Sequence, residues 1–290
     1  MTDNFEKAKR LHGRGRYTEA EELYAHVIAS NARDAEALYL LGTLLGQRGK
    51  LDEALIFLER AVNESPKNSV YHCNLGVIEH NLKRLEQAKI SFLLAINLNN
   101  KNVDAHYNLA KLYKELGLTD AALSSYGIVL SLEPSHLNAL INLGNILVDV
   151  GRLDDAIIQF KKVIELNPKD TLALVNLGNV YRRMGLPEKA INTYGRVLSI
   201  HAHDGLRIRS AVTLPVVYKS LDHIKEVRES LELKLEKLLE EDLEVSDPSL
   251  ETSTTNFFLA YQNYNDLALG NIVGSNMSNI GFVLQISMIV

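Results

Sequence analysis

The sequence is poor in cysteine, tryptophan and proline: its 290 residues include one cysteine, no tryptophan and six prolines. The single cysteine, Cys73, excludes an internal disulfide and indicates a reducing compartment. Because its neighbours are apolar, we interpret it as core filler and not as a nucleophile. The first ten residues, MTDNFEKAKR, carry charges where a signal peptide needs an apolar run. These features predict a cytoplasmic protein.

The chain also lacks a basic excess and the familiar motifs of catalysis. Its net charge of -5 is unsuited to a phosphate backbone, so nucleic acid is not expected as a partner. It contains no Gly-rich phosphate loop, no cysteine pair and no nucleophile elbow. Of nine histidines only His201 and His203 are close, and without a third ligand they are interpreted as a solvated helix end. We therefore expect no catalytic residue, no cofactor and no metal.

What the chain does contain is one pattern that recurs every 34 residues without insertion. A small residue recurs at Ala20, Ala54, Ala88, Ala122, Ala156 and Ala190. A large apolar residue follows four places later, as Tyr24, Leu58, Phe92, Tyr126, Phe160 and Tyr194. Upstream in four units stands a glycine interpreted as a packing residue: Gly42, Gly76, Gly144 and Gly178.

Each unit has the periodicity of two helices. In the fifth unit Leu140, Leu143 and Leu147 form one apolar stripe at three- and four-residue spacing. Gly151 then suits a helix end, and Pro168 closes the second helix. Neither helix can bury its stripe alone, so neighbouring units are expected to stack.

This pattern resembles the tetratricopeptide repeat (TPR). The resemblance implies an all-α fold, a right-handed α-solenoid of six helix pairs with a helical cap, and binding of partners on a curved surface. The repeats are predicted at residues 1–34, 35–68, 69–102, 103–136, 137–170 and 171–204.

Asparagines recur on one stripe of the first helix of each repeat. The sixth place holds Asn74, Asn108, Asn142 and Asn176, and the ninth place holds Asn145 and Asn179. In a TPR array this stripe lines the concave wall, where amides can match the C=O and N–H groups of an extended polypeptide. Such a row resembles the asparagine ladder of O-linked N-acetylglucosamine transferases. The alternative is that these side chains bridge adjacent repeats, and the sequence leaves both interpretations open.

The fifth place of the first helix argues against one type of partner. TPRs that bind chaperone C-termini carry a lysine clamp there. In this chain the place holds Phe5, Tyr39, Cys73, Tyr107, Ile141 and Val175. A chaperone C-terminus is therefore not expected as the ligand.

After residue 204 the repeat stops, and residues 205–266 are predicted as a helical connector with a polar linker at 247–255. A helix is expected from Leu221 to Leu243, as a cap of the array or as a short coiled coil. RIRSAVTLPVVYKSLDHI and TNFFLAYQNYND resemble the connector of bacterial SPINDLY-type O-linked N-acetylglucosamine transferases. Only 24 residues follow Asp266, too few for the catalytic core, so no enzyme activity is expected.

The last segment, residues 267–290, changes to an apolar Gly/Asn/Ser-containing tail. GNIVGSNMSNIGFVL, residues 270–284, resembles a fragment of the sodium/calcium exchanger repeat. The apolar run at 280–290 is about half of what a membrane span requires. Either a fused or truncated reading frame or a hydrophobic end that packs on the connector or on a membrane would explain it. Membrane association is not expected except through this tail.

Two functions follow. The first is a protein-interaction scaffold that binds an extended protein or peptide segment along its concave TPR surface. The alternative is the substrate-recognition part of a truncated protein O-linked N-acetylglucosamine transferase of the SPINDLY type.

Overall fold

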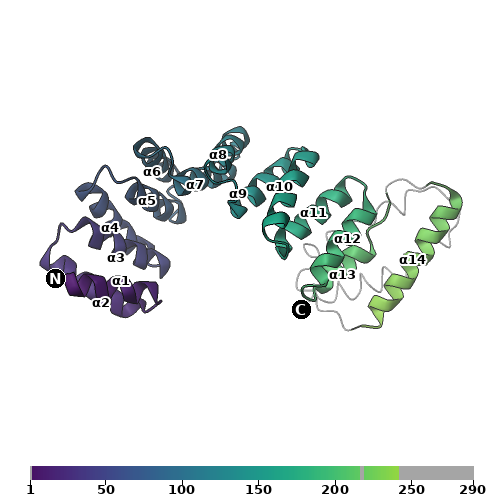
Figure 1. Ribbon diagram of the computed structural model, residues 1–290, viewed down its shortest axis with the longest axis horizontal. Coiled ribbons are helices and arrows are strands. Elements are labelled where there is room, and N and C mark those ends of the chain that lie inside the picture. Colours follow the sequence, from purple (N-terminus) through teal and green to yellow (C-terminus); the bar gives the residue numbers. More distant parts are fainter. Residues whose placement is uncertain (1, 216–218, 242–290) are drawn as a thin grey trace. The chain divides into compact units, whose positions relative to one another are not determined.

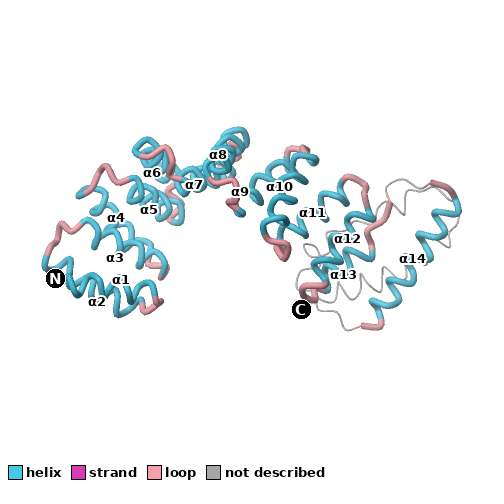
Figure 2. The backbone as a smooth tube through the Cα atoms, viewed as in Figure 1, coloured by secondary structure: helices cyan, strands magenta, loops and turns pink. Residues whose placement is uncertain are grey.

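The computed structural model describes residues 2–215 and 219–241, which contain fourteen α-helices and no strand (Figure 1, Figure 2). The chain divides into two compact units, residues 1–146 and 147–290, which we call unit 1 and unit 2. The predictions for the polar linker and for the tail at 267–290 concern residues outside the described part. The all-α fold predicted from the 34-residue pattern is confirmed.

Twelve of the helices alternate along the chain as the first and second helices of the six predicted repeats. The first helices of the pairs are α1 Thr2–Gly13, α3 Ala35–Gln47, α5 Ser69–Asn81, α7 Val103–Glu115, α9 Leu137–Asp149 and α11 Thr171–Arg183. The second helices are α2 Tyr17–Ser30, α4 Leu51–Glu64, α6 Leu85–Leu98, α8 Thr119–Leu132, α10 Leu153–Leu166 and α12 Pro187–Leu198.

The recurring small and large residues form the contact inside each pair. All six alanines predicted at helix contacts are fully buried, and the large residues four places later are buried with them. The upstream glycines let the helices approach: a Cβ atom added to Gly76 would lie 2.7 Å from the Phe92 ring, and one added to Gly42 would lie 2.8 Å from Leu58 Cγ. Gly178 has the same role beside Tyr194 at 2.3 Å. The predicted role of these glycines in packing is confirmed at these three positions.

The turn inside each pair has one fixed backbone conformation. Its central residue has a φ of 71–79° at Gly15, Gly49, Gly117, Gly151 and Gly185, a region that favours glycine. In the third repeat Lys83 occupies this place with a φ of 61°. The first helices begin at side-chain caps: Asp34 Oδ1 accepts from the Ala37 N–H at 3.0 Å, and Asn102 Oδ1 accepts from the Ala105 N–H at 3.0 Å.

In unit 1, the first helices of neighbouring repeats come closer together than the second helices do. Helix α3 contacts α5, and α5 contacts α7, besides the contacts inside each pair. The first helices therefore lie on the inner side of this stack. We call the stripe formed by the second, sixth, ninth and thirteenth places of each repeat the inner face.

In unit 2, two further helices follow the last pair: α13 Asp204–Ala211 and α14 Leu221–Leu239. The sequence interpretation missed α13, which contacts α12 and in turn contacts α14. The apolar stripe predicted for α14 is buried in its C-terminal half, at Leu231, Leu235 and Leu238, whereas Leu221 remains 57% exposed. In the part of the chain that the structure describes, no helix is both long and apolar enough to cross a membrane.

Candidate functional site

The sixth-place asparagines of unit 1 lie between repeats and bond to the fifth-place residue of the preceding repeat. Asn74 Nδ2 donates to the Tyr39 hydroxyl at 2.8 Å, and Asn142 Nδ2 donates to the Tyr107 hydroxyl at 3.1 Å. The Asn108 side chain lies beside the Cys73 thiol, whose pKa it lowers against the larger effect of burial. Each of these pairs joins consecutive first helices, so the amides do bridge adjacent repeats.

These bridges use only part of each amide. In the bonds of Asn74 and Asn142 to tyrosine the donor is Nδ2, whereas the Oδ1 atom of an amide can accept two further hydrogen bonds. Both side chains are half-buried, as is that of Asn108, so water reaches the stripe that they form. The bridge fixes the orientation of each amide and leaves it at the surface of the inner face.

The remaining asparagines differ in their surroundings. In unit 2, Asn179 Oδ1 accepts from the Tyr194 hydroxyl at 2.8 Å and from Arg209 Nη1 at 3.0 Å, and Arg209 is only 6% exposed. Asn179 thus ties α11 to α12 and α13. Asn145 and Asn176 are half-buried, and each also takes part in an interaction.

The residues that orient the asparagines were not identified from the sequence. Tyr39 and Tyr107 stand at the fifth place, where TPRs of the chaperone-binding type carry a lysine. Burial raises the pKa of Tyr39, and Tyr39 stacks on Tyr71 with ring centroids 4.4 Å apart. Burial likewise raises the pKa of the Cys73 thiol to about 12, which makes it unreactive and fits the prediction of core filler. The sequence feature that could have predicted these pairs is the 35-residue spacing between the fifth place of one repeat and the sixth place of the next.

Histidines make a second kind of bridge between the first helices of neighbouring repeats in unit 1. His12 Nε2 lies 3.0 Å from Gln47 Oε1, and His80 Nε2 lies 2.6 Å from Glu115 Oε2. Both pairs join the twelfth place of one repeat to the thirteenth place of the next. Between the second and third repeats the twelfth place is Gly46, and a pocket of about 280 Å³ opens there between α3 and α5.

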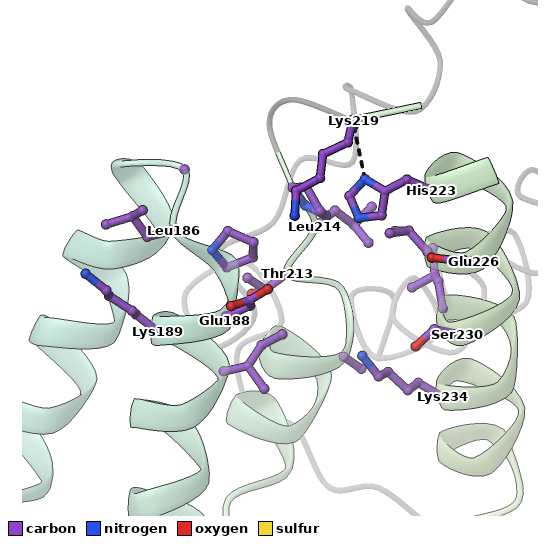
Figure 3. Close-up of a pocket in the computed structure, with 17 residues that line it drawn as sticks. Leu186, Glu188, Lys189, Thr213, Leu214, Lys219, His223, Glu226, Ser230 and Lys234 are labelled. Carbon is purple, nitrogen blue, oxygen red and sulfur yellow. Dashed lines mark hydrogen bonds between the residues drawn. The ribbon is translucent and has the colours of Figure 1, made fainter. Parts of the chain in front are cut away.

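A larger pocket, of about 490 Å³, lies in unit 2 between the start of α12, the residues after α13 and the part of α14 from His223 to Lys234 (Figure 3). Lysines and glutamates from separate elements line it: Glu188, Lys189, Lys219, Glu226 and Lys234. Its histidine, His223, accepts a hydrogen bond at Nδ1 from the Lys219 N–H at 3.2 Å, and its own N–H donates to Ser220 Oγ. His223 therefore belongs to the N-terminal turn of α14.

The close histidine pair has a structural role. His203 is the N-cap of α13, where its Nδ1 accepts from the Leu206 N–H at 3.2 Å. The interpretation as a helix end therefore holds, although at the start of a helix that was not predicted. Within residues 2–215 and 219–241 no cluster of three or more potential metal ligands is present.

Comparisons with known proteins agree with this architecture. Models described as tetratricopeptide repeat match residues 5–69, 70–102, 91–124 and 173–208, and one described as TPR repeat matches residues 144–185. No curated protein matches the chain. The matches thus support the TPR resemblance and give no support to the resemblances to SPINDLY-type transferases or to sodium/calcium exchangers.

Solved structures show the same fold. YrrB, a TPR protein with an unusual peptide-binding site, is 24% identical and aligns with a TM-score of 0.53 over 63% of this chain and 94% of its own. A TPR protein from Parabacteroides merdae is 18% identical, with a TM-score of 0.59 over 95% and 98% of the two chains. TTC0263 from Thermus thermophilus is 26% identical, with a TM-score of 0.51 over 62% and 97%. With its helix pairs and the matched family models, the chain belongs to the tetratricopeptide repeat proteins.

Proposed function

We propose that this chain is a protein-interaction scaffold that binds an extended polypeptide segment along the inner face of unit 1. The observation that carries the proposal is the recurrence of a half-buried amide at the sixth place of three consecutive repeats, at Asn74, Asn108 and Asn142. A tyrosine hydroxyl orients two of these amides, those of Asn74 and Asn142. Asn145 adds an amide at the ninth place of unit 1, and Asn176 and Asn179 are the corresponding residues of unit 2.

The physical reason lies in the chemistry of the amide. A polypeptide in extended conformation presents N–H and C=O groups at regular intervals, and a row of amides can satisfy both without reading side chains. The bridges to Tyr39 and Tyr107 hold two of these amides in place before a ligand arrives, which lowers the entropy cost of binding. YrrB, which shares the fold, is a TPR protein with a peptide-binding site.

The test compares two sets of variants. In the triple variant Asn74→Ala, Asn108→Ala and Asn142→Ala, each change removes a hydrogen bond worth about 0.5–1.5 kcal/mol. Affinity for a Ser/Thr-rich peptide library should therefore fall by roughly one to three powers of ten, since about 1.4 kcal/mol corresponds to tenfold. Fluorescence anisotropy measures the affinity, and circular dichroism checks that the variant is folded.

The matched control removes the bridge and keeps the amides. In the double variant Tyr39→Phe and Tyr107→Phe, both asparagines lose their hydroxyl partner. This variant should lose stability and should bind the library only a few-fold more weakly than the wild type, because the amides remain but are no longer held in place. If the folded triple variant binds as tightly as the wild type, the asparagines serve only as bridges and the proposal fails.

A further inference from the structure

The pocket between α3 and α5 is mixed in character, with an apolar floor and a neutral polar rim. It is lined by Thr43, Gly46, Gln47, Leu58, Asn74, Val77, Ile78 and Asn81. Leu58 is fully buried and Ile78 is 5% exposed, so these side chains form the floor. No charged residue lines the pocket.

At the pocket the second repeat lacks a side chain that the other repeats have, and Ile78 packs against Gly46 in its place. The place of Gly46 holds His12, His80, Lys114, Val148 and Arg182 in the other five repeats. In the first and third repeats this residue is the histidine that reaches the thirteenth place of the next repeat. Opposite Gly46 that place is Asn81, which has no histidine to meet it.

The floor is apolar for a second reason. Val77 stands at the ninth place, where the other repeats hold Lys9, Thr43, Lys111, Asn145 and Asn179. Two independent replacements, a glycine and a valine, therefore meet at one junction between repeats. They produce an uncharged hollow beside Asn74, which belongs to the row of inner-face amides.

We infer that this pocket, which we call the Gly46 pocket, takes one aliphatic side chain of the size of leucine or isoleucine from the bound polypeptide. The inference rests on the proposed function and adds a sequence preference to it. An aliphatic side chain would bury its own apolar surface against the half-buried Val77, above the buried Leu58 and Ile78, and that burial is favourable. The side-chain amides of Gln47, Asn74 and Asn81 would face the peptide groups on either side of the anchor.

The lack of charge in the lining decides against other occupants. A carboxylate or an ammonium group in this pocket would lose water without gaining a counter-ion, which is costly. A glycine or an alanine would bury much less apolar surface of its own. Affinity should therefore be highest for peptides with leucine or isoleucine at the anchor position, lower with alanine and lowest with aspartate.

The test uses Ser/Thr-rich peptides that differ at one central position, which is leucine, alanine or aspartate. The wild-type protein should bind the leucine peptide about tenfold more tightly than the alanine peptide, as expected for burying most of the additional methyl and methylene groups. It should bind the aspartate peptide more weakly than the alanine peptide.

Two variants come from the chain's own repeats. Val77→Asn introduces the residue that the fifth and sixth repeats hold at this place, and Gly46→His introduces the residue of the first and third repeats. A Cβ atom at position 46 would lie 2.6 Å from Ile78 Cδ1, the end of a side chain that can move. Each variant should reduce the preference for leucine over alanine to about one, a ratio that is independent of any general change in affinity for the peptides.

Equal binding of the leucine and alanine peptides by the wild type would overturn the inference, as would a preference that survives in both folded variants. Failure of the proposed function is distinguishable, because it appears as unchanged binding by the triple asparagine variant. If no peptide binds, N-acetyl-leucinamide is the probe, with the NMR signals of the Ile78 methyl groups as the readout. The inference is supported if N-acetyl-leucinamide shifts the Ile78 methyl signals of the wild type, whereas N-acetyl-alaninamide does not and the Val77→Asn variant shows no shift. If N-acetyl-leucinamide causes no shift in the wild type, the inference is overturned.

Discussion

Tyr126 and Tyr194 offer a matched pair for testing what a buried hydroxyl contributes. Both are fully buried at the same place of their repeats, 68 residues apart. The Tyr194 hydroxyl donates to Asn179 Oδ1 at 2.8 Å. The Tyr126 hydroxyl has no hydrogen-bond partner among the described residues, and burial raises the pKa of Tyr126. The same substitution, tyrosine to phenylalanine, should therefore have opposite effects at the two positions.

The magnitudes follow from the hydrogen bonds. An unsatisfied buried polar group costs about 1–3 kcal/mol, and removing the Tyr126 oxygen relieves this cost while leaving only a small void. We expect Tyr126→Phe to raise the free energy of unfolding by about 1 kcal/mol, which corresponds to a rise in melting temperature of roughly 2–4 °C. Tyr194→Phe removes a satisfied bond and should lower the free energy of unfolding by about 0.5–1.5 kcal/mol.

Urea and thermal unfolding of both variants, followed by circular dichroism, measure these effects. Repeat arrays can depart from two-state unfolding. The variants can therefore be compared only if the slope of their free energy of unfolding against urea concentration matches that of the wild type. If Tyr126→Phe destabilises the protein as much as Tyr194→Phe does, the reasoning is refuted, since the Tyr126 hydroxyl must then have a partner.

Three further outcomes are expected. Burial raises the pKa of Glu79, so the folded state keeps the carboxyl proton to higher pH and loses stability as the pH rises. Glu79→Gln should therefore raise the free energy of unfolding at pH 7, and urea unfolding at several pH values should show this gain vanishing below about pH 4. Gly178→Ala should cost about 1–3 kcal/mol against the Tyr194 ring, whereas Gly127→Ala, which meets nothing within 4 Å, should stabilise by about 0.5–1 kcal/mol. Cys73 should react with iodoacetamide roughly a hundredfold more slowly in the native protein than in denaturant; equal rates would contradict its burial.

The helix pairs could be predicted because their contacts repeat with the sequence. The residues at the places of Ala88 and Phe92 are buried in every repeat, so the 34-residue pattern indicates the packing directly. Helix α13 could not be predicted in this way, because seven of its eight residues follow the last repeat, which ends at residue 204, and because its N-cap is the unusual residue His203.

The candidate site was predictable only in part, for a different reason. The position of Asn74 on the inner face follows from the repeat, whereas its bond to Tyr39 depends on what the preceding repeat holds. The Gly46 pocket is a further case, because it arises from two replacements in adjacent repeats. Contacts inside a repeat recur, but contacts between repeats vary with each pair of neighbours.

The spacing of the histidine bridges has a consequence for how such a chain can change by recombination. Loss of the whole second repeat, residues 35–68, would bring His12 opposite Asn81, because both partners keep their places in the 34-residue register. The bridge would then have an amide partner again, as His12 has in Gln47. The same event would remove Gly46. One deletion of a repeat could thus erase a binding preference and leave the way in which the helices stack unchanged.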